Sequence, residues 1–240
     1  MKKIKNILGF IPARSGSKGI PRKNVRFVDG KPLIFYTINE ALKSKFLSRV
    51  VVSTDSRIIA ALAAKYGAKV IKRPKELARD DTPTSPVILH ALQELEKEGY
   101  KPDLIVILQP TSPFRKSYHI DEAVELFLRS DCDFVVSVCE AKITPFWCFT
   151  AEKNYLKPLL KHNLSGKRRQ DLPRTYVLNG AIFIYTPDKL FKNNLNYFNG
   201  KTLPYFMKPE ESIDIDDELD LILARELMRK EIYEESKSFR

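Results

Sequence analysis

The chain has 240 residues, of which 43% are hydrophobic and 30% are charged, and its formal net charge is +11. No apolar run approaches the roughly 18 residues that a transmembrane helix requires, and three cysteines without a C-x-x-C pair argue against a disulfide framework and a structural zinc site. We therefore expect a single domain, residues 1–240, in a reduced cytoplasm, with an excess of Lys and Arg that would serve either a nucleic acid or a small polyanion.

Short apolar runs alternate with helix-like patterns from residue 6 to residue 139, which is typical of a mostly parallel α/β sheet with helices on both faces. The apolar runs predict strands at residues 6–13, 49–55, 68–74, 103–113 and 133–139. Apolar residues at helical spacing predict helices at residues 33–44, 57–67, 85–99 and 119–130. The alternation resumes with a strand at 179–185, a short helix from Pro187, a strand at 203–208 and a final helical segment within 212–235.

The segment from Glu140 to Leu178 interrupts this alternation. It contains no α/β repeat and includes the basic stretch SGKRRQDLPRTY. A connection of this length without a helix of its own usually has a function or forms an extension of the fold. We expect residues 140–178 to form an inserted arm.

Polar residues follow four of the predicted strands. They are Arg14 to Asn24, Ser53 to Asp55, Arg73, and Gln109 to Arg115. Because ligands of open α/β sheets bind beyond the carboxyl ends of the strands, we expect these residues to converge on one crevice.

The loop after the first strand, IPARSGSKGIPRKN, is rich in positive charge. It does not match the Walker A motif, because Gly16 and Gly19 are only three residues apart with Lys18 between them. Glycines nevertheless let backbone N–H groups approach an anion, and Arg14, Lys18 and Lys23 would add positive charge around it. The alternative is a solvated basic turn; the combination of glycines, cations and a preceding strand favours a phosphate site.

The stretch IDIDDELD, which begins at Ile213, is the second informative motif. In an extended segment Asp214 and Asp216 share a face, while Ile213 and Ile215 point into the core. Two carboxylates beside phosphates suit Mg²⁺, which prefers oxygen ligands. The alternative is helix capping by Asp216 or by Asp217, and both interpretations hold together if Asp214 is the ligand and Asp217 is the cap.

Six motifs in order resemble those of the acylneuraminate cytidylyltransferases: IPARSGSKGIPRKN, VVSTD, RP followed by TPTSPVILHAL, LQPTSPFR, NGAIFIY and IDIDDELD. The resemblance covers nearly the whole chain. It implies a Rossmann-like nucleotide-diphospho-sugar transferase fold, and a homodimer in which the arm of one subunit helps to close the site of its partner. The implied reaction is that of CTP with a nonulosonic sugar acid, such as a sialic acid, to give the CMP-sugar and pyrophosphate.

The resemblance also implies roles for individual residues. The CTP phosphates would be held by Arg14, Ser17, Lys18 and Lys23, and the cytosine would be read by Asn24 and Arg73 together with Thr84 or Ser85. The sugar acid would contact Gln109 and Asn179. Apart from the resemblance, Arg168 and Arg169 are candidates to pair with its carboxylate, because Arg suits bidentate carboxylate recognition, and the alternative is an exposed charge of the arm. Asp214 and Asp216 would hold Mg²⁺. The catalytic set would be Arg14, Lys18, Lys23 and Asp216, and the proton acceptor stays open between Asp216 and a metal-bound water.

Two departures from the family pattern concern the sugar acid. Sialic acid synthetases tend to carry Arg just before the NGAI strand and Lys shortly after the turn in the arm, where this chain has Val177 and Trp147. Legionaminic, pseudaminic and other nonulosonic acids are therefore candidates beside N-acetylneuraminate.

Two other functions were weighed against this one. The first is a nucleotidyltransferase for another 2-keto-3-deoxy sugar acid or for a sugar phosphate. The second is a noncatalytic basic module that binds nucleic acid, which is disfavoured because no aromatic residues are interleaved with the basic loop. We expect neither a nucleic acid nor a membrane as a partner.

Overall fold

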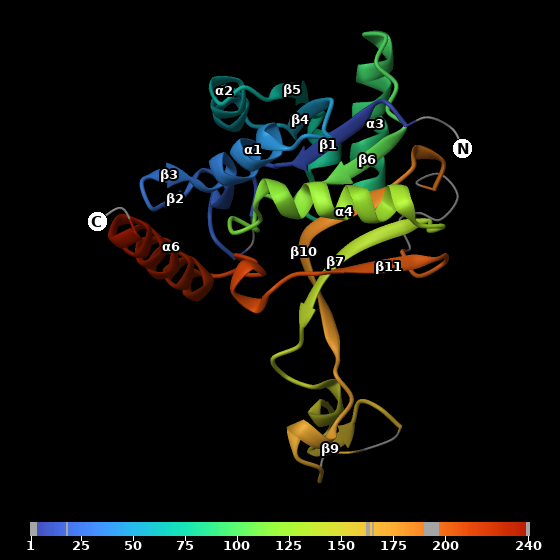
Figure 1. Ribbon diagram of the computed structural model, residues 1–240, viewed down its shortest axis with the longest axis vertical. Helices are drawn as coiled ribbons and strands as arrows, with labels where there is room; N and C mark the ends of the chain where they lie inside the picture. Colours follow the sequence, from blue (N-terminus) through green and yellow to red (C-terminus); the bar gives the residue numbers. More distant parts are fainter. Residues whose placement is uncertain (1–3, 18, 162–163, 165, 190–196, 239–240) are drawn as a thin grey trace.

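A seven-stranded sheet forms the centre of the computed structural model, which describes residues 4–17, 19–161, 164, 166–189 and 197–238. The strand order is β11-β7-β10-β6-β1-β4-β5 (Figure 1). The strands are β1 (Ile7–Pro12), β4 (Arg49–Thr54), β5 (Lys69–Lys72), β6 (Leu104–Ile107), β7 (Phe134–Glu140), β10 (Tyr176–Tyr185) and β11 (Thr202–Phe206).

Six of these strands are parallel, and β10 alone runs in the opposite direction. Strand β1 pairs in parallel with β4 and β6, β4 with β5, and β7 with β11, whereas β10 is antiparallel to both β6 and β7. The prediction of a mostly parallel sheet is confirmed, and the reversal of β10 is an additional finding.

Helices cover both faces of the sheet, as predicted. Helices α1 (Leu33–Lys43), α2 (Arg57–Lys65) and α4 (Ser117–Arg129) contribute to the apolar cluster on one face, and α3 (Thr84–Lys97) contributes to the cluster on the other. Successive residues of β1 serve opposite faces, since Leu8 and Phe10 belong to the α3 side and Ile11 belongs to the other.

The last helix, α6 (Glu218–Ser238), packs on a third apolar cluster beside the hairpin of β2 (Phe27–Val28) and β3 (Lys31–Pro32). The cluster is made by Ile20, Val28, Leu33, Phe114, Ile215, Leu221, Ala224 and Met228. Asp217 caps α6, because its carboxylate accepts the N–H groups of Leu219 at 2.9 Å and Asp220 at 3.0 Å. The cluster and the cap together fix the acidic segment that precedes α6 against the end of the basic loop.

The arm leaves the sheet at the carboxyl end of β7 and returns at the amino end of β10 (Figure 1). It contains two short 3₁₀ helices, Pro145–Trp147 and Arg169–Asp171, and a small sheet of β8 (Phe149–Glu152) and β9 (Tyr155–Pro158). The arm projects from the sheet and carries a hairpin of its own (Figure 1). Within the described residues, no helix is both long enough and apolar enough to cross a bilayer.

Candidate functional site

A cleft of about 480 Å³ opens at the carboxyl ends of β1 and β6. Its lining includes six of the predicted site residues: Arg14, Ser17, Lys23, Asn24, Gln109 and Asp216. An adjoining pocket of about 240 Å³ shares Pro12 and Arg14 with the cleft and is lined by two more, Arg73 and Thr84. The fold thus brings predicted site residues from distant parts of the sequence to one place. Lys18, the remaining predicted cation of the basic loop, lies outside the described residues.

Two of the described cations of the basic loop, Arg14 and Lys23, each contact a carboxylate. The Lys23 ammonium donates to the Ile215 carbonyl at 2.6 Å and to the Asp216 carboxylate at 2.9 Å. Arg14 forms an ion pair with Asp80. An anion that enters the cleft would meet both cations already oriented, and would compete with Asp80 and Asp216 for them.

The basic loop and the acidic segment touch through their backbones at Gly19. A Cβ atom added to Gly19 would lie 2.1 Å from the carbonyl oxygen of Asp216, a distance that no side chain tolerates. Glycine at this position therefore permits the approach that places Asp216 beside Lys23.

Asp55 holds the start of the basic loop against the end of β4. Its carboxylate accepts the backbone N–H of Ser15 at 2.8 Å and also the Ser15 hydroxyl. Burial by itself would raise the pKa of Asp55, but the hydrogen bonds from Ser15 and the charge of Arg73 lower it below its ordinary value. Sequence reasoning placed Asp55 in the crevice but gave it no role; its position at the end of a strand was the available signal.

Two of the residues predicted to read the base, Arg73 and Asn24, are held by hydrogen bonds. Arg73 is buried and donates from Nη2 to the Ser53 carbonyl at 2.8 Å, and burial lowers its pKa to about 10. The Asn24 amide is also buried and donates to the Arg14 carbonyl at 3.0 Å. Ser85 is the second residue of α3 and is half-buried. The hydrogen bonds of Arg73 and Asn24 hold these two side chains in place before any ligand arrives.

The acidic pair has the features that a hard cation needs. Asp214 accepts a hydrogen bond from the Thr111 side chain, yet its buried Oδ1 atom has no partner among the described residues. Burial raises the pKa of Asp214, and the Asp216 carboxylate adds to this shift. An orphaned buried carboxylate oxygen beside a second, exposed carboxylate fits Mg²⁺. In the described part of the chain no group of three or more His, Cys, Asp or Glu residues is placed to hold a metal ion.

Gly180 joins Gln109 to this acidic pair. It lies in an irregularity of β10 between Leu178 and Phe183 and has a φ of +72°, which glycine adopts without strain. A Cβ atom here would lie 2.9 Å from the Oε1 atom of Gln109 and 3.2 Å from the Oδ2 atom of Asp214. The Gln109 amide, the Asp214 carboxylate and the backbone of β10 therefore meet at this glycine.

Asn179, which was predicted to contact the sugar acid, is buried beside Gly180 with its amide in use. Its Nδ2 atom donates to the Ser212 hydroxyl at 2.9 Å, and its Oδ1 atom accepts from the Ser137 hydroxyl and from the Ala181 N–H group at 3.2 Å. These bonds tie the irregular part of β10 to β7 and to the loop before Asp214. The backbone of β10 approaches the Gln109 amide at Gly180, the residue that follows Asn179.

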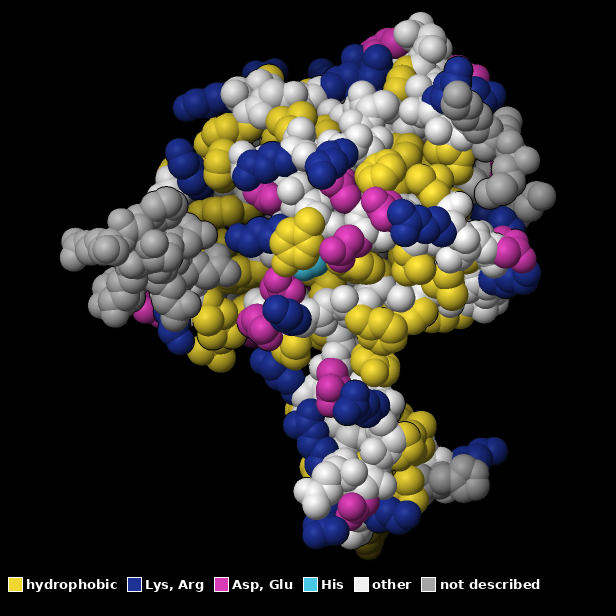
Figure 2. All heavy atoms as spheres, in the orientation of Figure 1, with side chains coloured by type: hydrophobic (Ala, Val, Ile, Leu, Met, Phe, Trp, Pro, Cys, Tyr) yellow, Lys and Arg dark blue, Asp and Glu magenta, His cyan; other side chains and the backbone are white. Residues whose placement is uncertain are grey.

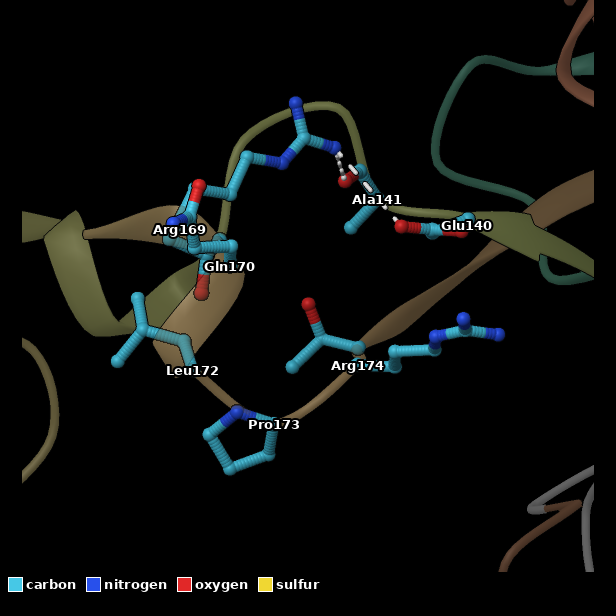
Figure 3. Close-up of a pocket in the computed structure, with 9 residues that line it drawn as sticks. Glu140, Ala141, Arg169, Gln170, Leu172, Pro173 and Arg174 are labelled. Carbon is cyan, nitrogen blue, oxygen red and sulfur yellow. Dashed lines mark hydrogen bonds and ion pairs between the residues drawn. The ribbon is translucent and has the colours of Figure 1, made fainter.

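The two predicted arginines of the arm lie apart from the cleft. Arg169 borders a cavity of about 440 Å³ at the base of the arm, where it reaches over to the Ala141 carbonyl at 3.1 Å (Figure 3). Arg168 pairs with Asp171 at 2.9 Å. None of the described residues that line this cavity is a predicted nucleotide or metal ligand. Within one chain, the structure does not bring these arginines to Gln109.

The two positions that depart from the family pattern are also separated. Trp147 lies in a 3₁₀ helix of the arm and is partly exposed. Val177 lines a pocket of about 280 Å³ together with Ile213, Asp214 and Leu223. Only Val177 is therefore placed next to the acidic pair of the same chain.

Comparison with protein families gives a match to the family described as Cytidylyltransferase over residues 8–174. The chain is 38% identical over 226 residues to the CMP-N,N'-diacetyllegionaminic acid synthase of Legionella pneumophila, covering 92% of this chain and 96% of that one. It is also 38% identical over 216 residues to the N-acylneuraminate cytidylyltransferase of Streptococcus agalactiae, covering 89% of this chain. The chain spans about half of that second relative, 51%.

The fold has a solved counterpart at low sequence identity. The structure of a CMP:2-keto-3-deoxy-manno-octonic acid synthetase complexed with CTP superposes with a TM-score of 0.69 and 17% identity, covering 94% of this chain and 99% of that one. This likeness shows that the two chains share the same α/β fold.

Proposed function

The chain belongs to the cytidylyltransferase family, and on that premise we propose that it transfers CMP from CTP to a nonulosonic sugar acid and releases pyrophosphate. The observation that carries this proposal is the meeting of the basic loop with Asp216 in one cleft, through Gly19 and Lys23, while Asp214 lines the neighbouring pocket. Cations beside two carboxylates suit a nucleoside triphosphate bound with a divalent cation.

The nucleotide would occupy the two adjoining pockets. Arg14, Ser17 and Lys23 would hold its phosphates, and Lys18 would join them as the family resemblance implies. The cytosine would enter the smaller pocket, where Arg73 lies beside Thr84, with Asn24 at the boundary. The guanidinium groups of Arg14 and Arg73 lie close enough to repel each other electrostatically, which favours an anion bound between them.

The proposed reaction is an in-line displacement. The anomeric hydroxyl of the sugar acid attacks the α-phosphorus of CTP and gives up its proton to Asp216 or to a water. The bond from the α-phosphorus to the bridging oxygen breaks, and pyrophosphate leaves. No covalent enzyme intermediate is required, so catalysis depends on positioning and on neutralising charge. Asp214 and Asp216 would hold Mg²⁺, which when bound neutralises charge on the phosphate oxygens. Lys23 would orient Asp216 and contact the phosphates from the other side.

The acceptor would lie at Gln109, where the cleft meets Gly180 and Asp214. Val177, Ile213 and Leu223 give the neighbouring pocket an apolar wall, which suits an acceptor with methyl or acyl substituents. Relatives named for legionaminic acid and for N-acylneuraminate are equally similar to the chain, so the proposal is made for the nonulosonic class.

We assign the arm to a homodimer contact, in which Arg168 and Arg169 would serve the site of a partner subunit. Exposed aromatic and aliphatic side chains on the arm support this role, among them Trp147, Phe149, Tyr155 and Leu156. Hydrophobic and basic side chains both lie on its visible surface (Figure 2). The three cysteines are unpaired, in keeping with a cytoplasmic location.

The function is tested by measuring pyrophosphate release with Mg²⁺ and each of CTP, UTP, ATP and GTP. The acceptor panel comprises N-acetylneuraminic, legionaminic and pseudaminic acids and a shorter 3-deoxy-2-keto sugar acid. We expect turnover with CTP and one nine-carbon acid. Preference for another nucleotide, or for the shorter acid, would replace this proposal with the corresponding alternative. Steeply salt-dependent binding to mixed DNA or RNA that CTP does not displace would indicate the nucleic-acid module instead.

Replacing Asp55 by Ala is expected to raise the KM for CTP by about tenfold, because it removes the charged acceptor that anchors Ser15 and the basic loop. The kcat should change much less, since Asp55 contacts no reacting group. Steady-state kinetics with CTP as the varied substrate measure both parameters.

Asp121→Ala is the matched control. Asp121 accepts the Ser44 hydroxyl at 2.6 Å and the Lys45 N–H group at 3.1 Å, so it braces a loop in the same manner but away from the cleft. Its removal should lower the melting temperature without changing the KM for CTP. An equal rise of this KM in both variants would contradict a local role for Asp55.

A further inference from the structure

Arg115 is a completely buried cation that the proposed reaction has not used. Its side chain is 0% exposed and makes three hydrogen bonds, all to neutral acceptors. Nη1 donates to the carbonyls of Gln109 at 3.1 Å and Ala181 at 2.8 Å, and Nη2 donates to the Thr37 hydroxyl at 2.6 Å. Its Nε atom has no partner among the described residues.

Burial of a guanidinium without a carboxylate in contact is unfavourable, because the charge loses its hydration and gains only neutral acceptors. Burial accordingly lowers the pKa of Arg115, and only the more distant charge of Glu40 opposes this shift. An apolar side chain would fill the same space without this penalty. The hydrogen bonds of Arg115 therefore provide connections between segments that an apolar side chain would not.

The acceptors of Arg115 belong to three separate segments. Thr37 is in α1, Gln109 follows β6, and Ala181 is in β10 directly after Gly180. The Gln109 amide contacts Gly180, and the carbonyls of Gln109 and Ala181 lie on either side of this contact. The Nη1 atom of Arg115 donates to both carbonyls.

The same loop also holds the acidic pair. The Thr111 carbonyl accepts a hydrogen bond from the Ile215 N–H group at 2.9 Å, and the Thr111 side chain forms a hydrogen bond with the Asp214 carboxylate. The loop from Gln109 to Arg115 therefore joins β10 at one side and the Asp214 segment at the other, and Arg115 is its only buried charged side chain among the described residues.

We propose that Arg115 is a positioning residue, which fixes the Gln109 and Ala181 carbonyls to each other and so holds the Gln109 amide over Gly180, facing the acceptor. The identity of that acceptor as a sugar acid rests on the proposed function. Arg115 touches no substrate itself; it acts through Gln109.

Arg115→Lys tests the proposal, since lysine keeps the charge but cannot span both carbonyls and Thr37 with the same fork. We expect kcat/KM for the sugar acid to fall by about 100-fold, as for other small misplacements of a substrate contact, while the KM for CTP is unchanged. In the Gln109→Ala background, Arg115→Lys should cause no further loss. Full additivity of the two losses would overturn the proposal.

A second variant and a second readout guard against simple misfolding. Thr37→Val removes the acceptor of Nη2 together with the hydroxyl that donates to the Gln109 carbonyl at 3.3 Å, and it should give a smaller loss of the same kind. Hydrogen exchange followed by mass spectrometry should speed up at residues 109–112 and 180–182 in both variants. Arg225→Lys is the matched control, because Arg225 also donates to a carbonyl, that of Phe27, but between α6 and β2.

The outcomes separate this proposal from the function itself. Equal losses for CTP and the sugar acid, or exchange that rises throughout the sheet, would make Arg115 a structural residue only and overturn the inference. If the unmodified protein turns over no acceptor in the panel, the proposed function fails, and the exchange data then decide on Arg115 alone. A local rise at the two segments would still support its positioning role, and no rise would refute it.

Discussion

Replacement of both Asp214 and Asp216 by Asn is expected to lower kcat by about 1,000-fold or more, because it removes the negative charges that would hold a divalent cation against the phosphates. The fold should persist. Asp214 is partly buried with an unpartnered Oδ1 atom, so a neutral amide there removes a desolvated charge, and Asp216 is exposed. Circular dichroism and thermal melting would verify the fold, and pyrophosphate release at increasing Mg²⁺ would measure the loss.

Asp217→Asn is the control for this double variant, because it lies in the same acidic stretch but caps α6. Asparagine caps helices about as well as aspartate, so stability and turnover should both be retained. Normal turnover of the double variant in Mg²⁺ would show that the metal assignment is wrong. A large loss in Asp217→Asn would show that the whole acidic stretch, and not the pair, is responsible.

Replacement of Gly180 by Ala is expected to lower kcat/KM for the sugar acid by about 100-fold, since the new methyl group would displace the Gln109 amide and crowd Asp214. Its effect on stability should be modest. The φ of +72° adds about 1 kcal/mol of backbone strain, and the Oε1 atom of Gln109, at the end of a flexible side chain, is free to move away. Kinetics with the sugar acid varied, together with urea unfolding, separate the two effects.

Gly99→Ala provides the matched backbone strain without the contact. Gly99 has a φ of +76°, and a Cβ atom there would meet nothing within 4 Å. Both variants should lose similar free energy of unfolding, but only Gly180→Ala should lose activity. A comparable loss of activity in Gly99→Ala would mean that general destabilisation, rather than the displaced Gln109 amide, explains the result.

The elements of the sheet were predictable where the signal is local. The helical spacing of Ile88, Ala91 and Leu95 identifies α3, and the apolar run of β6 identifies a strand buried on both faces. The direction of β10 was not predictable, because parallel and antiparallel strands with two buried faces carry the same apolar pattern. Its irregularity at Gly180 depends on partners in β7 and in the loop after β6, which a single segment does not reveal.

The site divides in the same way. The basic loop and the acidic pair were predicted because their charges and glycines are clustered in the sequence, and the cleft brings most of them together. Asp55 and Arg115 received no role, because each bonds to a side chain or backbone group far along the chain. Asp55 is 40 positions from Ser15, and Arg115 is 78 positions from Thr37. Charges clustered in the sequence indicate which residues bind a ligand. They do not indicate the distant residues that hold those side chains in position.

The arm is inserted between β7 and β10, which are antiparallel neighbours, so it connects them as an enlarged hairpin loop. The entropy of closing a flexible loop changes only with the logarithm of its length. Residues added or lost within the arm therefore alter the folding free energy of the sheet very little. Over evolutionary time this connection can therefore change in length and surface while the sheet and its cleft stay intact.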